Sequence, residues 1–200
     1  MSKEKVNDIR QYKNELRSKY KSIRKNLTDK EKDKLDNDIF NKVITSNAFK
    51  KSDTIITYVS TDIEIDTRKL IELSLKSGKT VAVPKCIDGT RNMKFYEINS
   101  FDDLEIATFS VLEPKTNVCK EFNDFNEKCL CIVPGMVYDL NGYRLGYGKG
   151  YYDRFLSQHK KMIKMGLCYC NCTINKLISG RFDVSVDYLV TEKYIKYLGG

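Results

Sequence analysis

Apolar residues recur every three or four positions through the first part of the chain. Between Val6 and Leu27 this spacing predicts an amphipathic helix. Thr28 is followed three residues later by Glu31, which is the arrangement of a capping box, so a second helix is expected to begin there. Its buried stripe is predicted to comprise Leu35, Ile39, Phe40, Val43 and Ile44.

Short β-branched or continuously apolar runs follow, and they alternate with further helical patterns. Helices are expected from Asp66 or Thr67 to Gly78 and over Tyr151–Lys160, and the polar stretch Asn117–Lys128 is predicted to be a loop. Strands are expected at Thr54–Ser60, Thr80–Pro84, Lys94–Ile98 (on an edge or in a hairpin), Cys129–Pro134, Ile163–Tyr169 and Tyr188–Thr191. Pro84, which has no N–H, is expected to end the second of these strands.

The alternation of strands and helices predicts one α/β domain over residues 1–200. Continuously apolar strands are typical of a parallel sheet that is covered on both faces. We therefore expect a three-layer α/β/α domain with a Rossmann-like, mostly parallel sheet and a small antiparallel edge. The 200 residues, 41% of them hydrophobic, are enough for a packed core.

Two classes of segment are missing from the sequence. No apolar run approaches the roughly 18 residues that span a bilayer. The start, M-S-K-E-K-V-N-D, is charged and lacks the apolar core of a signal peptide. A cytoplasmic protein without a membrane partner is therefore expected.

The seven cysteines include two groups with a period of two. Cys129 and Cys131 alternate, as do Cys168, Cys170 and Cys172. This is the period of one face of a strand, on which reduced cysteine behaves as a small hydrophobic residue. Zinc sites more often combine two C-x-x-C pairs, and the chain has a single histidine, so packing is favoured over metal binding.

The formal net charge of +8 has three interpretations. It could reflect a nucleic-acid surface, lysine-rich solvated helices such as Lys19–Lys34, or a cleft that attracts small polyanions. Charge alone does not choose among them. The sequence lacks interleaved exposed aromatic residues and any recognised nucleic-acid motif, so no nucleic-acid partner is expected.

The stretch R-L-G-Y-G-K-G-Y-Y-D, from Arg144 to Asp153, lies between a predicted strand and a predicted helix. Its glycines would let backbone N–H groups approach phosphate oxygens, and the helix N-terminus would add partial positive charge. Arg144 could bind two phosphate oxygens at once, while Lys149 would supply a mobile point charge. The G-x-G-x-G spacing is neither a Walker A loop nor G-x-G-x-x-G, and the alternative is a glycine-rich surface loop with chance charges.

Asp153 lies in the first turn of the predicted helix, where it could simply favour the helix dipole. It could also bind Mg²⁺ beside the phosphates, since this ion takes one or two carboxylates together with phosphate and water oxygens. Asp183 or Asp187 could supply the second carboxylate, and either could instead cap a turn.

With Asn141-Gly142 before it and Arg154 and Leu156 after it, this stretch resembles the signature of the 5-formyltetrahydrofolate cyclo-ligases, also called methenyltetrahydrofolate synthetases. The resemblance covers nearly the whole chain. The further segments that carry it are K-N-E-L-R (Lys13–Arg17), Y-V-S (Tyr58–Ser60) with Glu64 and Thr67, G-K-T-V-A-V-P (Gly78–Pro84), V-L-E-P (Val111–Pro114), I-V-P-G (Ile132–Gly135) and D-Y-L-V-T-E (Asp187–Glu192).

The resemblance implies an enzyme that uses ATP and Mg²⁺ to convert 5-formyltetrahydrofolate to 5,10-methenyltetrahydrofolate, with release of ADP and phosphate. In the implied mechanism the γ-phosphoryl group moves to the formyl oxygen, N10 attacks the iminium phosphate, and phosphate leaves. A monomer with the fold of the NagB/RpiA/CoA-transferase group is also implied. Removing Arg144 is expected to lower turnover sharply and to leave the fold intact.

The resemblance also implies a role for each residue of the site. Catalysis would use Arg144 and Lys149. The folate would contact Val59, Glu64, Tyr147 and Tyr151, and Mg²⁺ would be held by Asp153 and Asp183. ATP would be bound by Lys13, Arg17, Arg144, Leu145, Gly146, Gly148, Lys149, Gly150 and Tyr152.

Each assignment has a plainer alternative. Lys13 and Arg17 could be ordinary helix-surface charges, although their spacing of four places them on one side. Glu64 could pair with a nearby lysine, and the two adjacent tyrosines could pack the helix onto the sheet. We expect a mixed outcome, with one ring packed inward and the other at the ligand.

The sequence departs from the family at three places. Cys172 stands where glutamine is frequent, and Tyr147 stands where some relatives carry arginine. In Ile178–Asp183 only the aspartate matches, which leaves the choice between Asp183 and Asp187 open. Rival interpretations of the whole chain are a sugar-phosphate isomerase on a similar scaffold, which would need no ATP, and a basic nucleic-acid-binding module.

Overall fold

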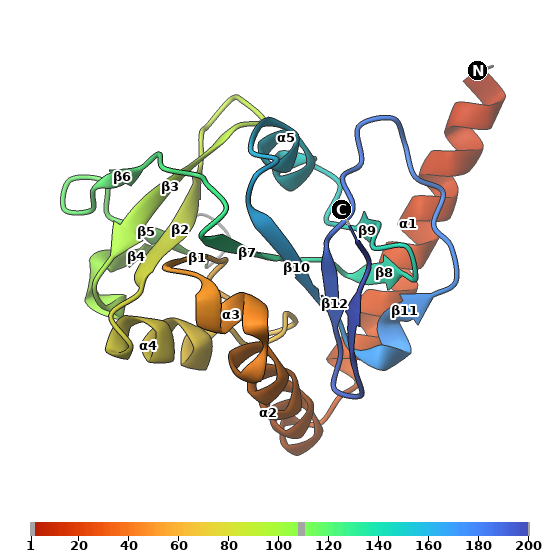
Figure 1. Cartoon of the computed structure of the whole chain (residues 1–200). Helices are drawn as coiled ribbons and strands as arrows, with labels where there is room; N and C mark the ends of the chain where they lie inside the picture. The colour runs from red at the N-terminus through yellow and green to blue at the C-terminus, as the bar shows by residue number, and fades with distance from the viewer. Residues whose placement is uncertain (1–2, 108–110, 200) are drawn as a thin grey trace.

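One large sheet flanked by helices forms the centre of the molecule (Figure 1). The computed structural model describes residues 3–107 and 111–199. Across the sheet the strands follow in the order β13 (Ile195–Tyr197), β12 (Tyr188–Val190), β10 (Ile163–Leu167), β7 (Cys129–Val133), β1 (Thr54–Ile56), β2 (Thr80–Cys86), β3 (Met93–Ile98) and β6 (Glu121–Phe122).

The inner strands of this sheet, from β12 to β2, all pair in parallel. The strand β13 on one side and the strands β3 and β6 on the other pair antiparallel. The expected mostly parallel sheet is therefore confirmed, with antiparallel strands at both edges. Two small sheets accompany it: β4 (Leu104–Ile106) with β5 (Leu112–Pro114), and β8 (Val137–Asp139) with β9 (Arg144–Leu145) and β11 (Thr173–Ile174).

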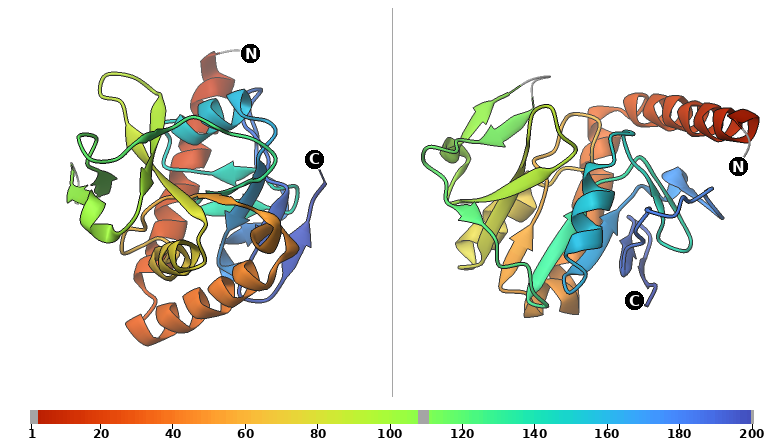
Figure 2. Two further views of the ribbon diagram at one scale, coloured as in Figure 1. Left: turned by 60° about the vertical axis from the view of Figure 1, so that its left-hand side comes forward. Right: turned by 90° about the horizontal axis from the view of Figure 1, so that it is seen from above.

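Helices cover both faces of the large sheet, as the three-layer prediction requires. In Figure 1, α2 (Asp29–Thr45), α3 (Asn47–Lys51) and α4 (Arg68–Lys76) lie below the sheet, and α5 (Tyr151–Gln158) lies above it. The long helix α1 (Lys3–Lys25) runs beside the loops at one end of the strands, and its N-terminal part extends past the sheet (Figure 2, right). In the described part of the chain, no helix has the length and apolar character needed to cross a bilayer.

The first two helices begin and end close to where the sequence placed them. The capping box at Thr28 is confirmed, because the Glu31 N–H donates to the Thr28 hydroxyl and the Glu31 carboxylate accepts from the Thr28 N–H at 2.9 Å. At the start of α4, Thr67 occupies the N-cap position but its hydroxyl donates to the carbonyl of Tyr58 instead. The first N–H of that helix, from Arg68, is accepted by Asp66 at 2.9 Å.

Two predicted strand boundaries are wrong. The strand β1 ends at Ile56 rather than at Ser60, because the chain leaves the sheet after Thr57 and turns into the loop that forms part of the site. The strand β2 continues through Pro84 to Cys86. Since β1 pairs with β2 only as far as Ala82, β2 is an edge on that side at Pro84, and a residue without an N–H is tolerated there.

Two further predictions are wrong in part. The stretch Asn117–Lys128 is mostly loop but contains the short strand β6, which pairs with β3. Cys168, Cys170 and Cys172 do not share a strand face, because β10 ends at Leu167 and Cys170–Cys172 forms a turn of 3₁₀ helix. The interpretation of the cysteines as reduced residues holds, since all seven are free thiols and most are buried.

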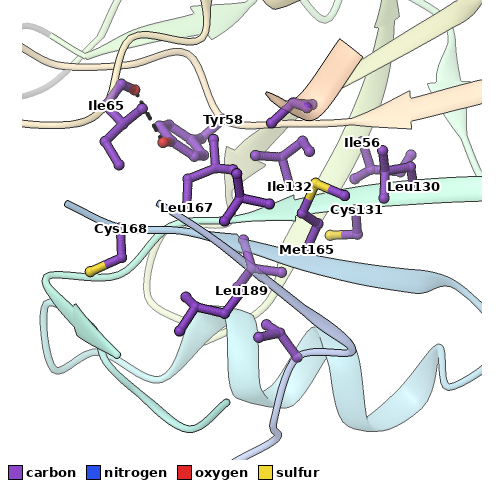
Figure 3. Packing of buried hydrophobic residues seen from close by; sticks show 14 of the residues in the cluster. Ile56, Tyr58, Ile65, Leu130, Cys131, Ile132, Met165, Leu167, Cys168 and Leu189 are labelled. Carbon is purple, nitrogen blue, oxygen red and sulfur yellow. Dashed lines mark hydrogen bonds between the residues drawn. The ribbon is translucent and has the colours of Figure 1, made fainter. Parts of the chain in front are cut away.

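The core lies between the sheet and its helices, and the inner strands supply most of it. Every residue of β7 is buried, which confirms the continuous apolar strand expected there. Figure 3 shows side chains of β7, β10 and β12 packed together, with Ile132, Met165 and Leu189 among them. In the same view the Tyr58 hydroxyl donates to the carbonyl of Ile65 at 3.1 Å, which fixes the loop after β1 onto this core.

The buried Tyr138 ring on β8 lies between two glycines. Its hydroxyl donates to the carbonyl of Val133 at 2.7 Å, at the end of β7. A Cβ added at Gly166 would lie 2.5 Å from the ring, and one added at Gly135 would lie 2.6 Å from it. The glycines therefore provide the space in which this ring attaches the small sheet of β8 and β9 to the large sheet.

We predict that Gly166→Ala will lower the free energy of unfolding by about 1–3 kcal/mol, because the new methyl group overlaps a ring that has no room to move. Gly180→Ala is the matched control, since its methyl group would meet nothing nearer than 3.8 Å. Urea denaturation of both variants measures the effect. Equal stabilities would contradict this packing.

Burial also predicts the reactivity of the cysteines. It raises the pKa of Cys131 and of Cys168 to about 12, so both remain thiols at mildly alkaline pH. The thiolate is the reactive form. We expect dithionitrobenzoate to modify only the half-buried Cys86 and Cys170 in the native protein, and all seven cysteines after unfolding. Rapid native modification of Cys131, detected by peptide mass analysis, would show that the core is open.

Candidate functional site

The topology of the sheet creates a crevice between β1 and β7. From β1 the chain passes through α4 to β2 on one side, whereas from β7 it passes through α5 to β10 on the other side. In open α/β sheets, ligands bind beyond the carboxyl ends of the strands at such a switch point. The loop after β1, the loop after β7 and the end of β2 all meet here, which makes this the expected place for a site.

A cavity of about 960 Å³ lies at this point. Its volume is near the upper end of the range for small-molecule sites, which is about 300–1,000 Å³. The structure brings every residue to which the resemblance gave a role into the lining of this one cavity. They are Lys13, Arg17, Val59, Glu64, Arg144, Leu145, Gly146, Tyr147, Gly148, Lys149, Gly150, Tyr151, Tyr152, Asp153 and Asp183.

The glycine loop joins β9 to α5 and depends on backbone conformations that favour glycine. Gly148 has a φ of +100° and Gly150, the N-cap of α5, has a φ of +73°. Among the residues that the structure describes, no side chain caps the start of α5, so its first N–H groups can bind an anion. A Cβ at Gly148 would lie 3.3 Å from the guanidinium of Arg17, whose Nε donates to the carbonyl of Gly146 at 2.9 Å. Arg17 on α1 therefore packs directly on the loop.

Arg144 is more deeply held than the sequence suggested. Its side chain is only 3% exposed, and it donates from Nη2 to Asp153 Oδ1 at 2.8 Å and from Nη1 to the carbonyl of Val184 at 2.9 Å. Part of its hydrogen-bonding capacity is thus already used within the protein. The guanidinium joins β9, α5 and the segment after Asp183, and only its remaining N–H groups are left for a phosphate.

The two candidate metal-binding carboxylates are both paired with candidate phosphate-binding cations. Asp153 pairs with Arg144, and Asp183 lies 3.4 Å from Lys13 Nζ. Burial raises the pKa of Asp153 above its ordinary value, while Arg144 and the N–H of Val184 oppose that shift. Asp183 also accepts from the N–H of Gly180 at 2.8 Å.

Asp187 is placed differently. Its carboxylate accepts from the N–H of Lys164 at 2.7 Å and pairs with the ammonium of the same residue at 2.9 Å. It does not line the cavity. The geometry therefore favours Asp183 over Asp187 as a partner of Asp153.

These residues fit a magnesium–phosphate group. Asp153 and Asp183 are close enough for the charge of one to raise the pKa of the other. Within residues 3–107 and 111–199, no group of three or more histidine, cysteine, aspartate or glutamate side chains is placed to hold a metal by itself. Proteins usually hold Mg²⁺ with one or two carboxylates, and phosphate and water oxygens complete its coordination.

Glu64 lies on the loop after β1, where the loop itself holds it. Its Oε2 accepts from the N–H and the hydroxyl of Thr61, at 2.9 and 2.8 Å. The hydroxyl of Tyr147 is also close, and burial together with the charge of Glu64 raises the pKa of that hydroxyl. Tyr147 is half exposed. Its interaction with Glu64 brings the glycine loop and the loop after β1 together in the cavity.

The adjacent tyrosines take two different positions, and both line the cavity. Tyr152 packs against the core, and its buried hydroxyl has no hydrogen-bond partner among the residues that the structure describes. An unpaired buried hydroxyl is costly, which is consistent with a partner supplied by a ligand. Tyr151 lies at the rim of the cavity, and its hydroxyl donates to the carbonyl of Thr90 at 3.3 Å.

Residue patterns gave no role to one wall of the cavity. This wall comes from β2, β3 and β5, which lie far from the glycine loop along the chain. The resemblance had identified two of its segments, Gly78–Pro84 and Val111–Pro114, without assigning a function to their side chains. The side chains include Lys85, Cys86, Met93, Leu112 and Glu113.

Comparison with known proteins identifies the family of the chain. Residues 9–192 match the model of the 5-formyltetrahydrofolate cyclo-ligase family. A protein of Schizosaccharomyces pombe, named probable 5-formyltetrahydrofolate cyclo-ligase, is 32% identical over 92% of this chain and 97% of its own. A Caenorhabditis elegans protein of the same name is 29% identical over 92% of this chain and 94% of its own.

Solved structures show the same relationship. The NMR structure of 5,10-methenyltetrahydrofolate synthetase from Aquifex aeolicus superposes with a TM-score of 0.80 at 34% identity, covering 93% of this chain and 92% of that one. The synthetase of Mycoplasma pneumoniae, at 24% identity and a TM-score of 0.70, shares the fold. The sequence resemblance is thereby confirmed, and the chain belongs to the 5-formyltetrahydrofolate cyclo-ligase family.

Proposed function

We propose that this enzyme closes 5-formyltetrahydrofolate to 5,10-methenyltetrahydrofolate with the consumption of MgATP and the release of ADP and phosphate. Membership of the family supports the folate chemistry. The cavity supports the use of a nucleotide, because cations, unpaired helix N–H groups and a pair of carboxylates gather on one side of it. We infer that residues 1–200 act as one catalytic domain. A monomeric state and a cytoplasmic location remain predictions from the sequence.

The observation that carries this proposal is the convergence of α1, the glycine loop and the segment at Asp183 on one cavity. Arg17 contacts the glycine loop from α1, and Lys13, on the same helix, contacts Asp183, which lies far along the chain. A sugar-phosphate isomerase would need an anion site, but it would not need a pair of carboxylates beside that site. The basic nucleic-acid module is not supported, because these cations line a cavity rather than an open face.

In this proposal ATP supplies a phosphoryl group that turns the formyl oxygen into a leaving group, through the phosphorylated formyl (iminium phosphate) intermediate. Asp153 and Asp183 would hold Mg²⁺, which neutralises phosphate charge. The N–H groups of the glycine loop, with Lys149 and Arg17, would orient the triphosphate. Glu64, fixed by Thr61, would orient the folate.

Arg144 would act mainly by holding Asp153 in place and by directing its remaining N–H groups at the transferred phosphoryl group. Phosphoryl transfer requires chiefly alignment and charge stabilisation, and such donors act most strongly where water is excluded. The nearly complete burial of its side chain meets that condition.

The direct test is the absorbance of methenyltetrahydrofolate formed from 5-formyltetrahydrofolate with and without MgATP. We expect product only when ATP and Mg²⁺ are both present, with one ADP released for each product. Product formation without ATP would overturn the nucleotide part of the proposal. No product under any condition would overturn the folate part.

We predict that Arg144→Ala will lower kcat by about 10²–10³-fold, the usual cost of losing a donor to the transition state. Because the substitution also leaves Asp153 without its ion-pair partner, we expect a loss of stability of about 1–3 kcal/mol, contrary to the expectation of an intact fold. Arg154→Ala is the control, since this exposed arginine follows Asp153 but does not line the cavity. Turnover is compared below the unfolding temperature of both variants. Near-normal turnover of Arg144→Ala would refute its role.

The second carboxylate is tested by comparing Asp183→Asn with Asp187→Asn. We expect Asp183→Asn to raise the Mg²⁺ concentration needed for nucleotide binding by about tenfold or more, since even outer partners of metal ligands cost about 10–100-fold. Asp187→Asn should leave that concentration unchanged and should lower stability, because its partner is Lys164. Calorimetric titration with ATP at varied Mg²⁺ measures the difference. The reverse ranking would transfer the metal-binding role to Asp187.

A further inference from the structure

The segment V-L-E-P (Val111–Pro114) contributes the carboxylate of Glu113 to the wall formed by β2, β3 and β5. No function has yet been assigned to the side chains of this wall. It forms β5, which pairs with β4 in a small antiparallel sheet, and Leu112 and Glu113 line the cavity. Cys86, at the end of β2, lines the same cavity. Burial raises the pKa of its thiol, and the charge of the nearby Glu113 raises it further. Glu113 is only partly exposed, and it lines the cavity.

No side chain or backbone group of the described residues satisfies this carboxylate. Within residues 3–107 and 111–199, Glu113 has neither a hydrogen bond nor an ion pair. Lys85, a cation that also lines the cavity, donates instead to Glu105 Oε1 and to the carbonyl of Pro114, each at 3.3 Å. Glu113 therefore faces the cavity with both of its oxygens uncommitted.

The position of Glu113 does not serve the stability of the small sheet. Glu105 lies directly opposite Glu113 in the pairing of β4 with β5. Like charges opposite each other in a sheet are unfavourable, and Lys85 compensates only one of the two. A carboxylate that costs stability and lines a cavity points to a function in binding.

The other carboxylates of the cavity are committed or exposed. Asp153 pairs with Arg144, Asp183 pairs with Lys13, and Glu64 accepts two hydrogen bonds from Thr61 on one oxygen. Asp88, on the turn between β2 and β3, is exposed at the rim. Among the described residues, Glu113 is thus the partly buried carboxylate that can still offer two oxygens side by side.

Two parallel oxygens match two parallel N–H donors. The pterin ring of a folate carries such a pair, because its 2-amino group and N3–H lie side by side on one edge of the 2-amino-4-oxopyrimidine. Adenine offers only the 6-amino group on the corresponding edge, next to a ring nitrogen that is an acceptor and would repel the second oxygen. Phosphates would be repelled by both oxygens.

We propose that Glu113 binds the 2-amino and N3–H edge of the substrate's pterin ring through both carboxylate oxygens. This inference rests on the proposed function and adds the residue that selects the ring. Leu112 and Met93 line the same cavity and give it apolar surface, and few polar groups in an apolar pocket are the usual means of fixing orientation. Glu64 would then contact the part of the folate that lies nearer to the phosphates of ATP.

The test measures binding of 5-formyltetrahydrofolate and of its 2-desamino-2-methyl analogue to the wild type, Glu113→Gln and Glu113→Ala. We expect the Kd of the natural substrate to rise by about 10–100-fold in both variants, because a charge-assisted pair of hydrogen bonds is lost. The analogue keeps N3–H but lacks the second donor, so it should bind the wild type more weakly than the natural substrate does, and its Kd should rise by a smaller factor in the two variants. The Kd of MgATP should not change, and the KM for folate should rise much more than kcat falls.

Glu105→Gln is the matched control, since it removes the opposite carboxylate of the same small sheet, outside the cavity. It should leave the Kd of both folates unchanged. Thermal unfolding of each variant shows whether the sheet has been disturbed.

Three results would overturn the inference. These are an unchanged Kd for 5-formyltetrahydrofolate in Glu113→Ala, a loss that is equal for the substrate and its desamino analogue, or a loss confined to MgATP, which would assign Glu113 to adenine. Failure of the proposed function would be seen differently: the wild type itself would neither bind nor convert 5-formyltetrahydrofolate.

Discussion

The site depends on the partly buried ion pair between Arg144 and Asp153. Arg144 begins β9, Asp153 lies in the first turn of α5, and the carbonyl of Val184 accepts the second guanidinium hydrogen bond. A strand, a helix and a segment 40 positions along the chain from Arg144 are therefore fixed around one planar group. The loop between Arg144 and Asp153 has few side chains of its own, and this pair holds its two ends together. The glycines can then present bare backbone without leaving the loop free to collapse.

The helix α1 supports the same arrangement from outside the sheet. Lys13, Arg17 and Arg24 are spaced by four and seven residues, so they project from one face of the helix. Lys13 contacts Asp183, Arg17 contacts Gly146, and Arg24 donates to the carbonyls of Gly135 and Met136. One helix face thus contacts three separate loops of the cavity. The charges on this face that looked like ordinary solvated residues are largely engaged in tertiary contacts.

The sequence predicted those parts of the fold that local patterns determine. The capping box at Thr28, the apolar strand at Cys129–Val133 and the glycine loop before α5 all follow from short stretches. It failed where a neighbouring strand decides the outcome. Pro84 continues its strand because β1 has already ended beside it, and Glu121–Phe122 becomes a strand because β3 offers an unpaired edge. The wall that carries Glu113 was not assigned for the same reason, since only tertiary packing brings β5 to the glycine loop.

The contact between Lys13 and Asp183 spans 170 positions of the chain. During synthesis the helix that carries Lys13 leaves the ribosome long before Asp183 does. The strands from β1 to β10 lie between these two residues in the chain, so they are made before the cavity can be completed. A nascent chain that stops before Asp183 would therefore lack the partner of Lys13 and one of the two candidate metal-binding carboxylates.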